Sequence, residues 1–110
     1  MPEIDVTPEQ AAELIRAGAQ LVDVREDYEY EAGRIEGSAR VGLNRLAAEA
    51  GTLDRETPVL FYCRVGARSA MAAQAFRRAG FEAYSLGGGL VRWHATGLPL
   101  EPEDGHVADH

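Results

Sequence analysis

The apolar run "PVLFYC", residues 58–63, constrains the fold more than any other stretch. A short run of this kind, nearly free of polar residues, is typical of a strand buried on both faces. Such strands belong to parallel sheets, whose neighbouring strands need long, usually helical, connections. The turn "RVGAR" follows directly, and residues 67–79 continue as a helical pattern. The expected apolar face of that helix consists of Met71, Ala72, Ala75, Phe76 and Ala79. This strand–turn–helix unit predicts an α/β domain.

The rest of the chain repeats the alternation of strand and helix. "TPEQ" predicts a helix start, with Thr7 as cap, Pro8 in the first helical position and Gln10 reaching back, and Gly18 ends that helix. Further strands are expected at residues 20–24, 39–41 and 82–86, and further helices at residues 28–32, 45–50 and around Trp93. Asp27 and Asn44 are the expected caps of the second and third helices. The sheet is therefore expected to be mostly parallel.

Composition limits the possible functions. A chain of 110 residues suits one domain. The net charge of −7 argues against a nucleic-acid partner, because such binding depends on neutralising phosphates. No apolar run is long enough to span a membrane, and the first residues do not resemble a secretory signal. One cysteine cannot form an internal disulfide, which fits a reducing compartment, so we expect a cytoplasmic protein.

That single cysteine, Cys63, ends the central strand. Ligands of open α/β sheets bind at the carboxyl ends of the strands, where loop amides and a helix start can face an anion. The same groups, with nearby arginines, favour the reactive thiolate form of a cysteine. Gly66 allows a tight curl of the loop, and Arg68 is placed to fold over the pocket and hold an anion. The alternative is that Cys63 is only a small buried apolar residue.

Other charged and polar residues have structural interpretations. Asp23 and Arg25 follow a strand, and we expect them to form pairs that fix loops near the site. Glu26, Glu29 and Glu31 are interpreted as a solvated helix face. Gly87 to Gly89 predict a tight turn rather than a dinucleotide loop. His106 and His110 have a ligand-like spacing without a third ligand, so no metal site is expected.

Three stretches in this order resemble the rhodanese family of sulfurtransferases. They are "LVDVREDYEYEAGRIEGS", residues 21–38, "CRVGARS", residues 63–69, and "LGGGLVRW", residues 86–93. The second is similar to the family's active-site loop, Cys-Arg-x-Gly-x-Arg-Ser. Arg34 and Ser38 stand where the family commonly has histidine and alanine. Val65 replaces a residue that is often serine or threonine.

The resemblance implies a fold and a mechanism. The expected fold is a rhodanese-like α/β domain over residues 1–101, with helices on both faces of the sheet, followed by a flexible tail at residues 102–110. Cys63 would attack a small sulfur-containing anion such as thiosulfate and carry one sulfur as a persulfide. A thiol, a protein acceptor or cyanide would then remove that sulfur, without a metal or organic cofactor. The implied binding residues are Arg64, Val65, Gly66, Ala67 and Arg68, with Ser69, Asp23 and Arg25 as structural support.

Three functions remain open from the sequence. The first is an enzyme, a thiosulfate sulfurtransferase. The second is a persulfide carrier that takes sulfur from a partner protein. The third is a non-catalytic rhodanese-like interaction module, against which the presence of Cys63, Gly66 and Arg68 counts. Because the chain has one cysteine, no second thiol can resolve a persulfide internally, and the sulfur must go to another molecule.

Overall fold

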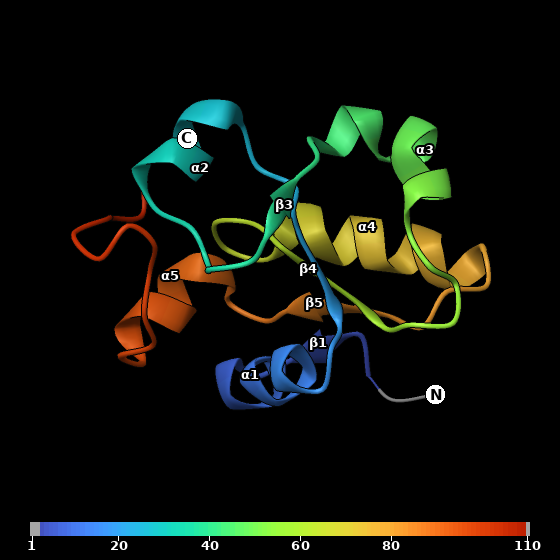
Figure 1. Ribbon diagram of the computed structural model, residues 1–110, viewed down its shortest axis with the longest axis horizontal. Coiled ribbons are helices and arrows are strands. Elements are labelled where there is room, and N and C mark those ends of the chain that lie inside the picture. The colour runs from blue at the N-terminus through green and yellow to red at the C-terminus, as the bar shows by residue number, and fades with distance from the viewer. Residues whose placement is uncertain (1–2, 110) are drawn as a thin grey trace.

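A five-stranded parallel sheet forms the centre of the protein. The computed structural model describes residues 3–109. The strands lie in the order β1-β5-β4-β2-β3, and every neighbouring pair is parallel (Figure 1). Their bounds are β1 Asp5–Val6, β2 Gln20–Asp23, β3 Ala39–Arg40, β4 Val59–Tyr62 and β5 Ala83–Leu86. The central strand β4 is buried along its whole length, which confirms the expectation drawn from the apolar run.

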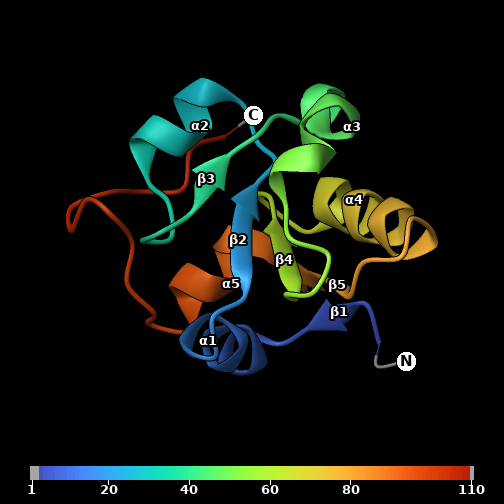
Figure 2. The ribbon, with the colours of Figure 1, turned by 45° about the vertical axis from the view of Figure 1, so that its right-hand side comes forward.

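Helices cover both faces of this sheet. Their bounds are α1 Pro8–Arg16, α2 Asp27–Ala32, α3 Leu46–Glu49, α4 Ala67–Arg78 and α5 Gly89–Ala95, with 3-10 turns at Leu43–Arg45 and Ala50–Thr52. α1 and α5 lie on one face, while α3 and α4 lie on the other (Figures 1 and 2). The α/β class and the two-sided helical cover are therefore confirmed. None of the described helices combines the length and hydropathy that a membrane span requires.

The side chains of β4 alternate between two apolar clusters. Val59 and Phe61 pack in a cluster with Phe76 of α4, and Leu60 and Tyr62 pack in a second cluster with Trp93 of α5. Successive side chains of a strand point to opposite faces, so one apolar strand fills both halves of the core. The cysteine that follows β4 is thereby held on a strand fixed from both sides.

Helix α1 begins as the sequence predicts. The backbone N–H of Gln10 donates to Thr7 Oγ1 at 3.1 Å, and the N–H of Thr7 donates to Gln10 Oε1 at 2.9 Å. The two expected caps further along the chain were wrong. Glu26 is the cap residue of α2, because Asp27 is already helical and its carboxylate pairs with Arg40.

At α3 the expected cap Asn44 belongs to a 3-10 turn that leads into the helix. Arg45 therefore takes the cap position, and no side chain caps this helix. Strand β1 was also missed, since its two residues carry no alternating pattern of their own. It exists through pairing with Ser85 and Leu86 of β5.

The tail that the sequence predicts to be flexible has defined neighbours in the structure. Within it, the N–H of His106 donates to the carbonyl of Ala32 at 2.9 Å. Directly before it, Glu101 forms an antiparallel bridge with Arg34. The C-terminal segment thus returns from α5 to α2 (Figures 1 and 2). The domain boundary at residue 101 and the flexibility of the tail stay predictions.

The apolar face of α4 was only partly predicted. Ala72 and Phe76 are buried as expected, but Met71 is 60% exposed, and Ala75 and Ala79 are exposed as well. The expected stripe also omitted Ser69 and Ala73, which are buried. The buried face of α4 is therefore rotated by about one residue from the face that the sequence predicts. The apolar spacing in the sequence did not reveal this rotation of the helix.

The two faces of α4 generate a stability prediction. We expect Phe76→Ala to lower the free energy of unfolding by about 3–5 kcal/mol, because it opens a cavity against Phe61 and Phe81. Met71→Ala on the same helix should change it by less than about 0.5 kcal/mol, since that side chain is exposed. Urea unfolding followed by circular dichroism measures both. Equal losses in the two variants would contradict the observed orientation of α4.

Candidate active site

Two backbone amides converge on the Cys63 sulfur just beyond β4. Its Sγ accepts the backbone N–H of Gly66 at 3.1 Å and that of Ser69 at 3.4 Å. The Sγ and the hydroxyl Oγ of Ser69 are also 3.5 Å apart. Amide N–H groups that converge on one atom stabilise negative charge there. The structure thus brings the cysteine and the loop amides together as the sequence predicts.

Gly66 makes this convergence possible. Its φ of +106° lies in the left-handed region, which side chains with a Cβ rarely adopt. The residue is also the cap position of α4, which begins at Ala67. The chain therefore reverses within the loop and turns the N–H groups of Gly66 and Ser69 toward the sulfur. The expected tight curl at Gly66 is confirmed.

The triple-glycine turn supports the loop from behind. The N–H of Leu90 donates to the carbonyl of Cys63 at 2.9 Å, and the N–H of Val91 donates to that of Arg64 at 3.1 Å. A Cβ on Gly89 would lie 2.3 Å from the Arg64 carbonyl oxygen, so only glycine permits this approach. The predicted tight turn is confirmed. The sequence did not show that this turn packs against the cysteine loop.

Ser69 ties the loop to the sheet. Its hydroxyl is 2.7 Å from Ser85 Oγ on β5 and donates to the Gly66 carbonyl at 3.2 Å. Both serines are fully buried. Sequence reasoning included Ser69 through the resembling loop and missed Ser85, which sits in an ordinary strand pattern. Together they fix the distance between the Cys63 sulfur and the start of α4.

Asp23 and Arg25 form the buried pair that the sequence predicts. Arg25 Nη2 lies 2.7 Å from Asp23 Oδ2, and neither side chain is exposed. The same nitrogen donates to the Gly33 carbonyl at 2.8 Å, at the end of α2. Burial would lower the pKa of Arg25, but the hydrogen bond and charge of Asp23 raise it overall. The pair connects the end of β2 to the end of α2.

The prediction that Glu29 belongs to a solvated helix face is wrong. It is fully buried, and its carboxylate accepts Arg68 Nη1 at 3.0 Å and Nη2 at 3.1 Å. Helix α2 turns this one residue toward the start of α4, while its neighbour Glu31 remains exposed. Arg68 was expected to hold an external anion, and here its bidentate partner is Glu29. The sequence did carry a signal, since Glu29 belongs to the first stretch that resembles the family.

The Glu29–Arg68 pair shifts both groups toward their charged forms. Burial alone would raise the pKa of Glu29, but the hydrogen bonds from Arg68 and the Glu26 amide lower it below its ordinary value of 4.5. The hydrogen bonds to Glu29 raise the pKa of Arg68, with smaller contributions from the charges of Cys63 and Asp23. Both side chains thus remain ionised at neutral pH, which joins α2 to the cysteine loop.

The outer residues of the loop reach the surface above the buried thiol. Val65 is 48% exposed, and Ala67 is exposed as well. Arg64 is partly exposed, and its Nη2 donates to Asp109 Oδ1 at 3.1 Å. The arrangement offers a small nucleophile, two amides directed at it, and a partly exposed guanidinium on the next residue of the loop. These are the groups needed to accept and hold one small anionic atom or group.

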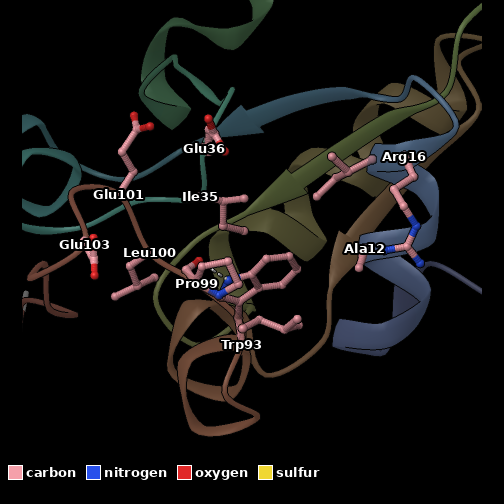
Figure 3. Close-up of a pocket in the computed structure, with 11 residues that line it drawn as sticks. Ala12, Arg16, Ile35, Glu36, Trp93, Pro99, Leu100, Glu101 and Glu103 are labelled. Atoms are coloured by element: carbon pink, nitrogen blue, oxygen red, sulfur yellow. Dashed lines mark hydrogen bonds between the residues drawn. The ribbon is translucent and has the colours of Figure 1, made fainter.

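A separate cavity of about 830 Å³ lies away from this loop. It opens between α1, α5 and the segment after α5 (Figure 3). Trp93 and Pro99 lie at its centre, with Glu36, Glu101 and Glu103 toward one end and Arg16 at the other. No residue of the 63–69 loop lines it. This cavity could not be predicted from the sequence, because its lining residues come from four separate segments.

Within residues 3–109, no group of three or more His, Cys, Asp and Glu side chains could hold a metal ion. His106 lies in the segment beside α2, and His110 lies outside the described residues.

Comparison with known proteins places this fold and loop in a class. The model of the rhodanese-like domain family matches residues 7–96. The chain belongs to the rhodanese-like domain family. The resemblance of the three sequence stretches is therefore confirmed.

Two related proteins and one solved structure show the extent of the similarity. The chain is 35% identical over 103 residues to thiosulfate sulfurtransferase GlpE of Pseudomonas aeruginosa, covering 93% of each protein. It is 41% identical over 85 residues to the uncharacterized protein YqhL of Bacillus subtilis, covering 74% of this chain and 68% of YqhL. A rhodanese-related protein from Thermoplasma volcanium superposes with a TM-score of 0.83 at 26% identity, covering 89% of this chain and 97% of that one.

The buried glutamate generates a pH-dependent prediction. We expect Glu29→Gln to lower the free energy of unfolding at pH 7 by about 1–3 kcal/mol, because Arg68 loses its charged partner. Since folding lowers the pKa of Glu29, its stabilising effect is complete above the ordinary value of 4.5. It is lost as the pH falls through the lower folded pKa, so the two proteins should converge in stability below pH 4.5.

The matched control is Glu31→Gln on the exposed side of the same helix, which removes the same charge. It should change the free energy of unfolding by less than about 0.5 kcal/mol. Urea unfolding of both variants at several pH values measures the difference. A loss for Glu29→Gln that is the same at every pH would contradict the ionised pair.

Proposed function

We propose that the protein is a sulfurtransferase that moves a sulfane sulfur from thiosulfate or a related donor to a thiol or cyanide, through a persulfide on Cys63. The observation that carries the proposal is the Cys63 Sγ within reach of the Gly66 and Ser69 amides, at the carboxyl end of β4. The relative named thiosulfate sulfurtransferase supports it, because the similarity covers nearly all of both chains.

The reaction consists of two displacements on sulfur. The Cys63 thiolate attacks the outer sulfur of thiosulfate, the S–S bond of thiosulfate breaks, and sulfite leaves with the electron pair. The product is an anionic persulfide on Cys63. An acceptor thiolate or cyanide then attacks the terminal sulfur, and the electron pair of the broken S–S bond returns to Cys63. Both steps balance without a cofactor.

Each loop residue has a role in this scheme. The Gly66 N–H and neighbouring loop amides hold the sulfur anion, and Arg64 meets the donor anion at the rim. The backbones of Val65 and Ala67 carry the loop around the sulfur. Arg68 contributes positive charge near Cys63 and is itself positioned by Glu29.

The surrounding residues support the scheme at a distance from the reacting atoms. Ser69 holds the start of α4 against β5, and the Asp23–Arg25 pair fixes the end of α2. We expect the domain to span residues 1–101, with the remaining residues as an appended tail. The need for a free thiol favours a cytoplasmic location.

A persulfide carrier is the second candidate function. The single cysteine is compatible with it, because a persulfide on Cys63 must pass its sulfur to another molecule in either function. In that case a partner protein, rather than thiosulfate, would supply the sulfur. The partly exposed loop residues would then meet a protein surface. The two functions differ in the donor and share the covalent intermediate.

The assay that tests the proposed function is thiocyanate formation from thiosulfate and cyanide. We expect turnover by the wild-type protein and none by Cys63→Ser, because the serine hydroxyl is not a nucleophile at neutral pH. Circular dichroism of the variant checks that it folds. A wild type that is inactive with thiosulfate but accepts sulfur from a persulfide-bearing donor protein would favour the carrier. Turnover that survives in Cys63→Ser would overturn the proposal.

The loop geometry generates a second activity prediction. We expect Gly66→Ala to lower kcat/KM for thiosulfate by about tenfold or more, because a Cβ at φ +106° forces the N–H away from the sulfur. Gly18→Ala is the matched control, since Gly18 has a φ of +99° and nothing within 4 Å of an added Cβ.

Both glycine variants should lose about 1–2 kcal/mol of stability from the left-handed backbone. Only Gly66→Ala should lose activity while folded. Steady-state kinetics at a temperature where both variants are folded measures the effect. Equal activity in the two variants would show that the Gly66 amide has no part in the reaction.

A further inference from the structure

The segment after residue 100 is seated along the end of α2. Arg34 and Glu101 exchange two backbone hydrogen bonds, of 3.0 and 2.7 Å. Five residues further on, the N–H of His106 donates to the Ala32 carbonyl at 2.9 Å, and Val107 packs against the apolar cluster that contains Trp93. The segment is therefore joined to the domain at separate points along its length.

Two glycines allow this close approach. A Cβ on Gly33 would lie 2.4 Å from the His106 carbonyl oxygen, and one on Gly105 would lie 2.9 Å from the Ala32 carbonyl oxygen. Neither residue has a left-handed φ, so glycine here provides space rather than an unusual backbone. The path of the segment toward the cysteine loop is thus set by backbone contacts.

This path brings a carboxylate to the loop. Asp109 Oδ1 accepts a hydrogen bond from Arg64 Nη2 at 3.1 Å. Arg64 is the residue directly after the nucleophile, and its Nε is buried with no hydrogen-bond partner among the described residues. The other loop arginine, Arg68, is already paired with Glu29. Arg64 is thus the loop arginine whose partner is a removable surface carboxylate.

We propose that Asp109 is a specificity-determining residue that competes with the anionic donor for Arg64. The inference rests on the proposed function, because it concerns the donor site of that reaction. The Asp109 side chain is 95% exposed, so water replaces Arg64 at little cost when the carboxylate leaves. A small dianion such as thiosulfate must displace it. A donor that is held by other contacts and places no anionic group at Arg64 does not have to displace the Asp109 carboxylate.

The competition has a limited and measurable size. Exposed ion pairs change an equilibrium by about two- to fivefold at low ionic strength, and salt reduces the effect. Removing the Asp109 charge should therefore tighten thiosulfate binding by about two- to fivefold. This gain in thiosulfate affinity should become smaller when the ionic strength is raised with sodium chloride at constant, neutral pH.

The experiment uses full-length protein that carries Cys63→Ser, so that thiosulfate binds without reacting. Amide NMR shifts of residues 64–69 are followed during titration with thiosulfate at constant ionic strength. Asp109→Asn should lower the Kd by about two- to fivefold. Asp104→Asn, a control that removes the same charge from an exposed position of the same segment, should leave the Kd unchanged. An unchanged Kd in Asp109→Asn, equal changes in both variants, or no thiosulfate binding near Arg64 would overturn the proposal.

A kinetic readout separates this inference from the proposed function. In protein with Cys63 intact, Asp109→Asn should lower the KM for thiosulfate by a similar factor and leave kcat unchanged. Tighter binding by Asp109→Asn without any turnover in the wild type would support the competition and reject the sulfurtransferase. Turnover by the wild type with no change in KM in Asp109→Asn would support the sulfurtransferase and reject the competition.

Discussion

The convergence of two backbone amides on the Cys63 sulfur is the interaction on which the rest of the site depends. Gly66 and Ser69 direct their N–H groups at the sulfur because Gly66 adopts a left-handed backbone and α4 starts immediately after it. The sulfur itself is fixed by β4, the most buried strand of the sheet. A fixed nucleophile and fixed dipoles need little reorganisation when charge develops on sulfur. In the proposed function, the stabilisation of charge on sulfur therefore depends on backbone geometry more than on any single charged side chain.

Three distant parts of the chain hold this geometry. The glycine turn before α5 approaches the loop from behind, with amides on the Cys63 and Arg64 carbonyls. Helix α2 supports it through Glu29 on Arg68, and the buried Asp23–Arg25 pair fixes the end of that helix. The three stretches that resemble the family thus meet in space at one loop. Each stretch contributes contacts that support the Cys63 loop.

Much of this arrangement could be predicted because it is encoded locally. The apolar run of β4, the capping box at Thr7 and the glycine in the loop each act over a few residues. Features that depend on tertiary contacts were missed. Strand β1 forms only against β5, and Glu29 is buried only because α2 turns it toward Arg68. The cavity beside Trp93 and the reach of Asp109 to the loop also require the folded chain.

In the proposed function, the loop amides allow Cys63 to hold a second sulfur. Intact-mass measurement after incubation with thiosulfate and removal of excess donor tests this step, combined with peptide mapping of the product. We expect a gain of one sulfur atom, located on Cys63 and lost on addition of cyanide. A protein whose mass does not change, although the donor is intact and Cys63 is reduced, would contradict it.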